Sequence, residues 1–203
     1  MQYISKKKQP DTWENLLLSA DSDYVSLIVL AEAGLAMGTS LWLAEQSVEK
    51  YLKSWLKKTD PGYKVNKHGH DLVEIWKDAK SICNPVNLKF EDYERFVTDL
   101  NLEGDSTDLR YSFGFTIQLP IFFEEFASLG DLLRFELLGE EEYKMRGRSA
   151  GLPDSFLDGR VSQLSGNSSE IASGDLISEF VEKSRNVGLG SASFREFFRK
   201  SSK

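Results

Sequence analysis

Three lysines on one side of a predicted helix could hold an anion. Lys50, Lys53 and Lys57 occur at positions i, i+3 and i+7, a spacing that brings side chains to one side of a helix. Their ammonium groups could bind a phosphate or an acidic partner. Alternatively, Glu45, Glu49 and Lys53 form ion pairs along a solvated face that binds no ligand.

The segment His68-Gly69-His70-Asp71 places two imidazoles and a carboxylate close together. These groups are zinc ligands in other proteins, but two histidines do not complete a site. In the structural alternative, Asp71 stabilises the N-terminus of a helix, and His70 caps that helix or bonds across the fold. We therefore predict no metal site.

Arg110 lies in a polar segment beside Asp105 and Asp108. Its guanidinium could bind a phosphate, or it could pin its own loop by binding a carboxylate. The acidic runs at 124–125 and 140–142 are typical of a solvated surface rather than of acid–base catalysis. The sequence has no Ser/His/Asp order, glycine-rich phosphate loop or Cys/His metal spacing, so it predicts no catalytic residue and no cofactor.

Apolar residues repeat at helical spacing in five segments, and no segment alternates as a strand does. The helices are expected from Asp23, after Gly38, from His70, around 90–100 and around 122–137. Asp60-Pro61-Gly62 should end the second of them. These patterns predict an all-α fold, an up-and-down bundle of about five helices. The helix from Asp23 is expected to be central, because it is apolar on both sides.

The chain is expected to have three parts. Residues 1–20 form an N-terminal arm with a short helix near 12–18, residues 21–144 form the bundle, and residues 145–203 form a less ordered Ser/Gly-rich extension. Within the extension, two short amphipathic pieces could dock on this chain or on a partner. They contain Leu176, Ile177, Phe180 and Val181, and then Phe194, Phe197 and Phe198.

Composition limits the classes of partner. The net charge of −7 and the pI near 5.0 give no overall attraction to nucleic acid or to anionic membranes. The apolar stretch 24–43 is interrupted by Glu32 and by glycines, and the N-terminal lysines precede no signal-peptide core, so we expect neither a membrane span nor secretion. The single cysteine, Cys83, cannot form an internal disulfide and is expected to be buried. A cytoplasmic protein is the resulting expectation.

Three pieces of sequence together resemble the HEPN family (higher eukaryotes and prokaryotes nucleotide-binding). An A-x-x-x-x-E-K-x-L-K pattern begins at Ala44, H-D-L follows at 70–72 across a short loop, and L-R-Y occurs at 109–111. Ser112 stands where the family usually has proline. The resemblance covers residues 21–140.

The resemblance implies an up-and-down helical bundle, often a homodimer, in a family linked to nucleotides, to partner nucleotidyltransferases and, in many members, to RNA cleavage. Ribonuclease members use an R-x(4–6)-H motif, and no arginine precedes either histidine of this chain. We therefore expect a non-nuclease HEPN-like module that binds a nucleotide or a partner protein. The candidate ligand-binding residues are Lys50, Lys53, His70 and Arg110.

Two other functions remain open. The first is an RNA-cleaving enzyme of the HEPN toxin type with a displaced active site, in which His70 and Arg110 act across a dimer. The second is a purely structural oligomerisation or adaptor domain that uses the phenylalanines of the extension. RNA is thus a less favoured partner than a nucleotide, and no membrane partner is expected.

Overall fold

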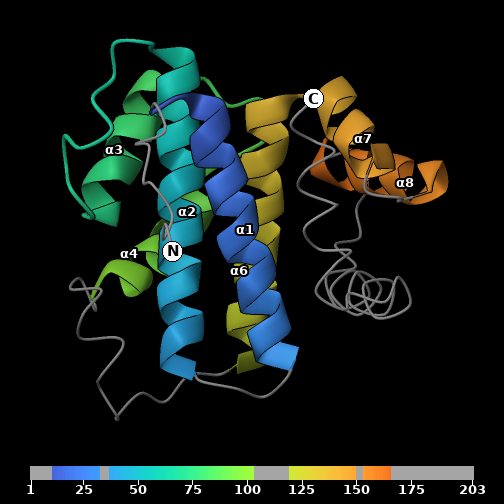
Figure 1. Ribbon diagram of the computed structural model, residues 1–203, viewed down its shortest axis with the longest axis horizontal. Coiled ribbons are helices and arrows are strands. Elements are labelled where there is room, and N and C mark those ends of the chain that lie inside the picture. The colour runs from blue at the N-terminus through green and yellow to red at the C-terminus, as the bar shows by residue number, and fades with distance from the viewer. Residues whose placement is uncertain (1–10, 33–36, 103–118, 150–152, 166–203) are drawn as a thin grey trace, which may run out of the picture. The chain divides into compact units, whose positions relative to one another are not determined.

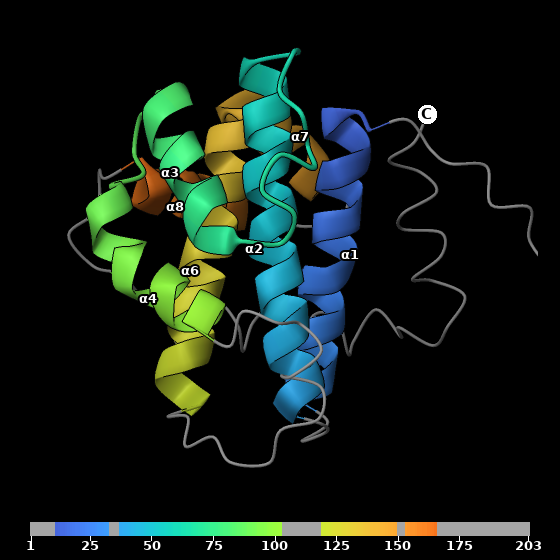
Figure 2. The same cartoon turned by 90° about the vertical axis from the view of Figure 1, so that its left-hand side faces the viewer.

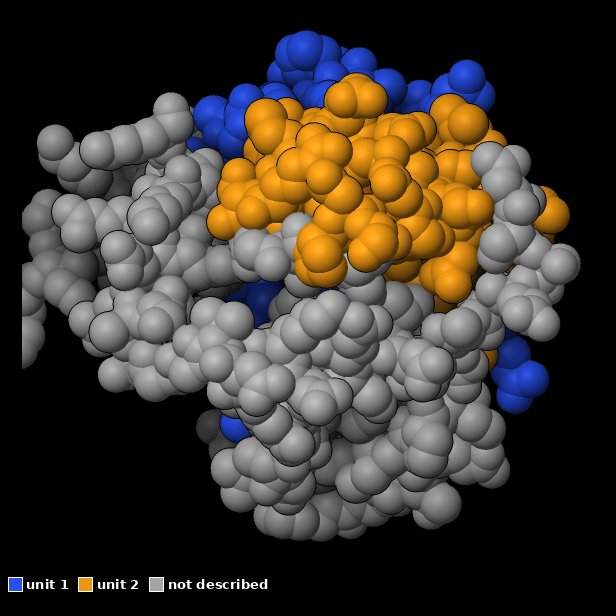
Figure 3. Space-filling model, turned by 90° about the vertical axis from the view of Figure 1, so that its right-hand side faces the viewer, with its two compact units in different colours: residues 1–84, 94–114 blue, residues 85–93, 115–203 orange. Residues whose placement is uncertain are grey.

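All regular secondary structure in the described part of the chain is helical. The computed structural model describes residues 11–32, 37–102, 119–149 and 153–165, and these contain seven α-helices and no strand (Figure 1). The predicted all-α class is confirmed. The chain divides into two compact units (Figure 3), with residues 1–84 and 94–114 in unit 1 and residues 85–93 and 115–203 in unit 2. Each unit is described by itself.

Unit 1 is built on two long helices, α1 (Trp13–Glu32) and α2 (Met37–Thr59), which pack side by side and antiparallel (Figure 1). α1 is continuous where we expected two helices, and the boundary predicted at residue 21 falls within it. Residues 19–23 include neither glycine nor proline, so nothing in this polar stretch breaks the helix. The Ser26 hydroxyl donates to the Ser22 carbonyl, one turn earlier in the same helix, at 2.7 Å.

α2, not α1, is the helix buried on nearly all sides between residues 40 and 56. Its predicted apolar stripe is confirmed as core. The other buried positions are polar: the Ser47 hydroxyl donates to the Ala20 carbonyl at 3.2 Å, and the Ser54 hydroxyl donates to the Trp13 carbonyl at 2.6 Å. These two bonds attach α2 to the backbone of α1. The stripe consists of Leu41, Ala44, Val48, Tyr51, Leu52 and Trp55.

Two shorter helices follow α2, as the apolar repeats predicted. α2 ends at Thr59, before Asp60-Pro61-Gly62, and α3 (Leu72–Ile82) packs against α2 (Figure 2). α3 buries Leu72, Ile75, Trp76 and Ala79. α4 (Phe90–Leu102) belongs to unit 1 from Glu94 onward, where the Asn101 side-chain oxygen accepts from the Leu72 backbone N–H at 2.7 Å.

Unit 2 contains α6 (Leu119–Leu138), α7 (Glu140–Ser149) and α8 (Asp154–Leu164). α6 buries the predicted face of Phe126, Leu129, Leu133 and Leu137. The predicted start of the extension, residue 145, falls inside α7. The helical unit therefore extends beyond residue 145 through the rest of α7 and through α8, and both amphipathic pieces predicted further on lie outside the described residues.

Ion pairs and backbone contacts hold unit 2 together. Arg160 on α8 is buried and donates to Asp131 on α6 through Nε at 3.0 Å and Nη2 at 2.5 Å. Glu136 on α6 accepts backbone N–H groups from Val86 and Leu88, each at 2.9 Å, and also from Asn87. One carboxylate thus fixes the turn before α4.

Among the described helices, none has the length and apolar character that crossing a bilayer requires.

The close approach of α7 and α8 gives a stability prediction. A Cβ added at Gly147 would lie 2.4 Å from Leu157 Cδ2, and Leu157 is buried. We expect Gly147→Ala to lower the free energy of unfolding by about 1–2 kcal/mol, because overpacking exceeds the gain in helix propensity. Thermal or urea unfolding measures this change.

Gly159, on α8, is the matched control, because nothing lies within 4 Å of its added Cβ. There, Gly159→Ala should stabilise by about 0.5–1 kcal/mol. Equal effects of the two substitutions would contradict the packing of α7 on α8.

Candidate functional site

The α2–α3 loop, residues 60–71, carries the histidines and several lysines. It is a series of tight turns, in which the Lys67 N–H donates to the Lys64 carbonyl at 2.9 Å and the Asp71 N–H donates to the His68 carbonyl at 3.0 Å. Gly69 has φ +58°, a left-handed conformation that favours glycine. The loop therefore has a defined backbone conformation.

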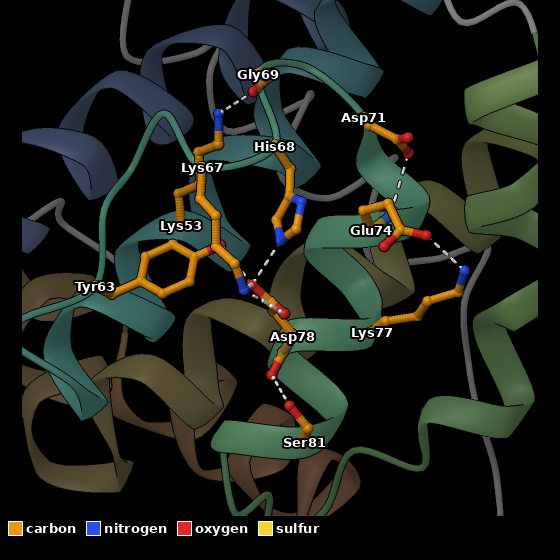
Figure 4. A network of polar contacts seen from close by, with 10 residues as sticks. All are labelled: Lys53, Tyr63, Lys67, His68, Gly69, Asp71, Glu74, Lys77, Asp78 and Ser81. Atoms are coloured by element: carbon orange, nitrogen blue, oxygen red, sulfur yellow. Dashed lines mark hydrogen bonds and ion pairs between the residues drawn. The ribbon is translucent and has the colours of Figure 1, made fainter.

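Glu49 on α2 connects the loop to the helix. Its Oε1 accepts from Lys53 Nζ at 2.6 Å, and its Oε2 lies 3.0 Å from His70 Nδ1. The Glu49 and Lys53 side chains are only 4% and 5% exposed. Lys53 Nζ also donates to the Gly69 carbonyl at 2.5 Å (Figure 4). We call Glu49, Lys53, Gly69 and His70 the Glu49 cluster.

The Glu49 cluster gives Lys53 and His70 different roles. The Lys53 ammonium binds both the Glu49 carboxylate and the Gly69 carbonyl, so it attaches the loop to α2. The His70 side chain is 65% exposed. Because its Nδ1 faces Glu49, its Nε2 lies on the opposite side of the ring. An imidazole held by a carboxylate at one nitrogen and open at the other is suited to accept or donate a proton, or to bind an anion when protonated.

Asp78 on α3 holds the other part of the loop (Figure 4). It accepts from the Tyr63 hydroxyl at 3.1 Å and from Lys67 Nζ at 2.8 Å, and His68 Nε2 lies 2.8 Å from the same carboxylate. We call Asp78, Tyr63, Lys67 and His68 the Asp78 cluster. The Lys67 side chain remains 50% exposed and the His68 side chain only 18%.

The Asp78 cluster changes the pKa of two of its members. Burial would raise the pKa of Asp78, but the bonds from Lys67, His68 and Tyr63 outweigh it and lower that pKa below its ordinary value of 3.8. The pKa of Tyr63 is raised, first by burial and then by its bond to Asp78. Asp78 is therefore a stable anion that organises three donors.

The predicted row of lysines is divided among three partners. Lys50 pairs with Asp23 on α1, and Lys53 belongs to the Glu49 cluster. Lys57 Nζ donates to the Tyr63 carbonyl at 3.1 Å and to the Pro61 carbonyl. The alternative of a solvated face with Glu45, Glu49 and Lys53 is wrong, because all three residues are buried.

The structure brings together Lys53 and His70 from the predicted site. Lys50 points to α1 instead, and Arg110 lies outside the described residues. The sequence pattern places Glu49 only on a solvated surface, and it does not identify Lys64, Lys67 or Asp78 as site residues. The concentration of four basic or titratable side chains within residues 64–70 was the available signal.

The structural interpretation of His70 and Asp71 is confirmed. The Asp71 carboxylate caps α3 by accepting from the Glu74 N–H at 3.1 Å, and His70 bonds across to α2. The two histidines are held by different carboxylates. Within residues whose positions are described, no group of three or more His, Cys, Asp or Glu side chains could hold a metal ion.

Cys83 is buried as expected, and burial raises the pKa of its thiol to about 11, an effect only partly offset by its contact with the Thr59 hydroxyl at 3.7 Å. A thiol with a raised pKa is a poor nucleophile near neutral pH. Cys83 is thus part of the core.

Comparisons with protein-family models, with curated proteins and with solved structures find no match for this chain.

The lowered pKa of Asp78 gives a prediction about stability and pH. A carboxylate whose pKa is lowered by folding stabilises the fold at pH values above its ordinary pKa of 3.8. This stabilisation is lost as the pH falls through the lower pKa of the folded state. At pH 7 we expect Asp78→Asn to lower the free energy of unfolding by about 1–2 kcal/mol, since charged hydrogen bonds become neutral ones. The difference from wild type should shrink below about pH 4.

Urea titrations at pH 7 and at pH 3 measure both effects. Lys77→Ala is a control on the same helix, because the Lys77–Glu74 pair is exposed and such pairs contribute at most about 1 kcal/mol. A difference between Asp78→Asn and wild type that is the same at both pH values would refute the assigned role of the charge.

Proposed function

We propose that this protein is a non-nuclease HEPN-like module that binds the phosphate groups of a nucleotide through its α2–α3 loop. The observation that carries the proposal is a loop with exposed Lys64 and His70 whose backbone is held by two carboxylates, the buried Glu49 and the partly buried Asp78. Binding of a partner protein's acidic or phosphorylated group would use the same chemistry, and the nucleotide is the ligand we test.

The accessible cations of the loop support an anionic ligand. Lys64 is exposed, and its ammonium makes no ion pair with any residue of the described ranges. Lys67 and His70 are half or more exposed. Local positive charge therefore exists on a chain whose net charge is −7, and a local patch is sufficient to attract phosphate.

The fixed backbone supports specific binding rather than loose attraction. The Lys53 bond to the Gly69 carbonyl and the contacts of Asp78 hold the loop before any ligand arrives. A site that is already ordered loses less conformational entropy on binding. On this proposal Lys53 positions the loop and Lys64, Lys67 and His70 face the phosphate.

A nucleotide titration tests the proposal. ATP should bind and adenosine should not, since the phosphates make the contacts. ATP at 100 times its dissociation constant should stabilise the fold by about 2.7 kcal/mol in a thermal-shift assay. Lys64→Glu should weaken ATP binding about fivefold or more, because the reversal removes an exposed ion pair of up to about 1 kcal/mol and adds a repulsion between like charges.

The matched control is Lys89→Glu, which makes the same change of charge at an exposed lysine outside the loop. It should leave the dissociation constant for ATP within about twofold, because Lys89 is not part of the loop that contacts the phosphates in this proposal. Equal weakening by both variants would indicate a response to net charge, and no binding of ATP or of its hydrolysis products would overturn the proposal.

A second candidate function is metal-independent RNA cleavage, which the contact between Glu49 and His70 favours. The open Nε2 of His70 would accept the proton of a 2′-hydroxyl, and the 2′ oxygen would bond to phosphorus. The bond from phosphorus to the 5′ oxygen would then break, and that oxygen would take a proton from solvent. Lys64 and Lys67 would contact the phosphate.

An RNA assay in the presence of EDTA tests this candidate. Wild type should produce fragments with 2′,3′-cyclic phosphate ends, and His70→Ala should lower the rate by about a hundredfold or more, as expected for loss of a general base. Lys89→Ala serves as the control. Intact RNA, or cleavage that survives His70→Ala, removes this candidate and leaves the binding module.

A further inference from the structure

We infer that His70 makes anion binding by the α2–α3 loop dependent on pH, with tight binding when the imidazole is protonated and weak binding when it is neutral. This inference rests on the proposed function. It assigns to His70 a regulatory contact with phosphate and to Glu49 the positioning of that contact.

The first step concerns which nitrogen carries the proton of the neutral ring. Glu49 offers only acceptor oxygens to His70, and its other oxygen already accepts from the Lys53 ammonium. The Nδ1 of His70 must therefore donate, which requires a hydrogen on Nδ1 in both charge states. The tautomer of neutral His70 is fixed by this contact.

The second step concerns the exposed nitrogen. With Nδ1–H fixed, neutral His70 presents a lone pair at Nε2, and protonated His70 presents an N–H donor there. A lone pair repels a phosphate oxygen, whereas a cationic N–H binds it. The 65% exposure of the side chain leaves this edge of the ring accessible. One proton thus converts the open edge from an acceptor into a charged donor.

The third step concerns the charges around the ring. His68 differs from His70, because its Nε2 is held by Asp78 and its side chain is largely buried, so its charge acts on loop anchoring. The remaining neighbours are carboxylates and ammonium groups, apart from the phenol of Tyr63. The charged or titratable residues of the loop and of the helices that hold it are Glu49 and Lys53 on α2, Asp60, Tyr63, Lys64, Lys67, His68 and Asp71 in the loop, and Asp78 on α3.

The ligand class follows from these contacts. The exposed ammonium of Lys64, the half-exposed ammonium of Lys67 that Asp78 shares, and one switchable imidazolium match an anion with several oxygens, such as the polyphosphate of a nucleoside triphosphate. A hydrogen bond to a charged group contributes about 1.5–3 kcal/mol, so protonation of His70 should strengthen binding about tenfold or more.

Binding of metal-free ATP should be measured at pH 5.5, 6.5, 7.5 and 8.5 for wild type, His70→Gln and Lys64→Gln. Glutamine can still donate to Glu49 but cannot be protonated. The dissociation constant of His70→Gln should exceed that of wild type about tenfold at pH 5.5 and should equal it within about twofold at pH 8.5. The ligand's own titration cancels in this ratio, because every variant meets the same ATP.

Lys64→Gln is the control, because it removes a charge that does not change over this range. It should weaken binding by the same factor at every pH. His70→Lys supplies a second variant in case His70→Gln is unstable. The ratio of its dissociation constant to that of wild type should fall about tenfold from pH 5.5 to pH 8.5, because only wild type loses the charge at residue 70.

A ratio of His70→Gln to wild type that stays constant from pH 5.5 to 8.5 overturns this inference while the proposed function stands. ATP binding that is absent in wild type at every pH overturns the proposed function, and this inference with it.

Discussion

The buried ion pair between Glu49 and Lys53 is the constraint on which the organisation of unit 1 depends. Two charges removed from water have a large desolvation cost, which their mutual attraction offsets only when further hydrogen bonds complete both groups. Here those bonds come from the loop, through the Gly69 carbonyl and the His70 ring. If the loop moved away from α2, the buried pair would lose the hydrogen bonds that offset its desolvation cost. A short polar segment is thus held in place by the cost of buried charge, in addition to the burial of Tyr63.

The faces of α3 and α6 followed from their apolar repeats, because burial of these side chains is decided within one element. The environment of α2 did not follow, since charged residues at i and i+4 give the same pattern on a solvated face and in a buried pair. What distinguishes the two cases is a partner far along the chain. Ser54 bonds to the backbone of Trp13 and Glu136 bonds to that of Val86, contacts that no local pattern contains.

The same limit explains how much of the candidate site was predictable. His70 and Lys53 were identified by type and spacing, and the structure places them on one carboxylate. Lys50 and Lys57 share a helix side with Lys53, but long side chains reach in different directions and find α1 and the Tyr63 carbonyl instead. Spacing places Cα atoms on one face, and the nearest acceptor then decides where each ammonium lies.

The carboxylates of Glu49 and Asp78 fix the inner side of the α2–α3 loop and leave other side chains of the loop exposed. Asp78 and Glu49 each hold one histidine, on either side of Gly69, whose left-handed backbone lets the chain reverse between them. Each carboxylate also neutralises one lysine. The inner charges are thus balanced, and the outer surface of the loop retains Lys64 and the open edge of His70. Because Lys64 has no carboxylate partner in the described ranges, its charge is available to an anion even though the whole chain carries a net charge of −7.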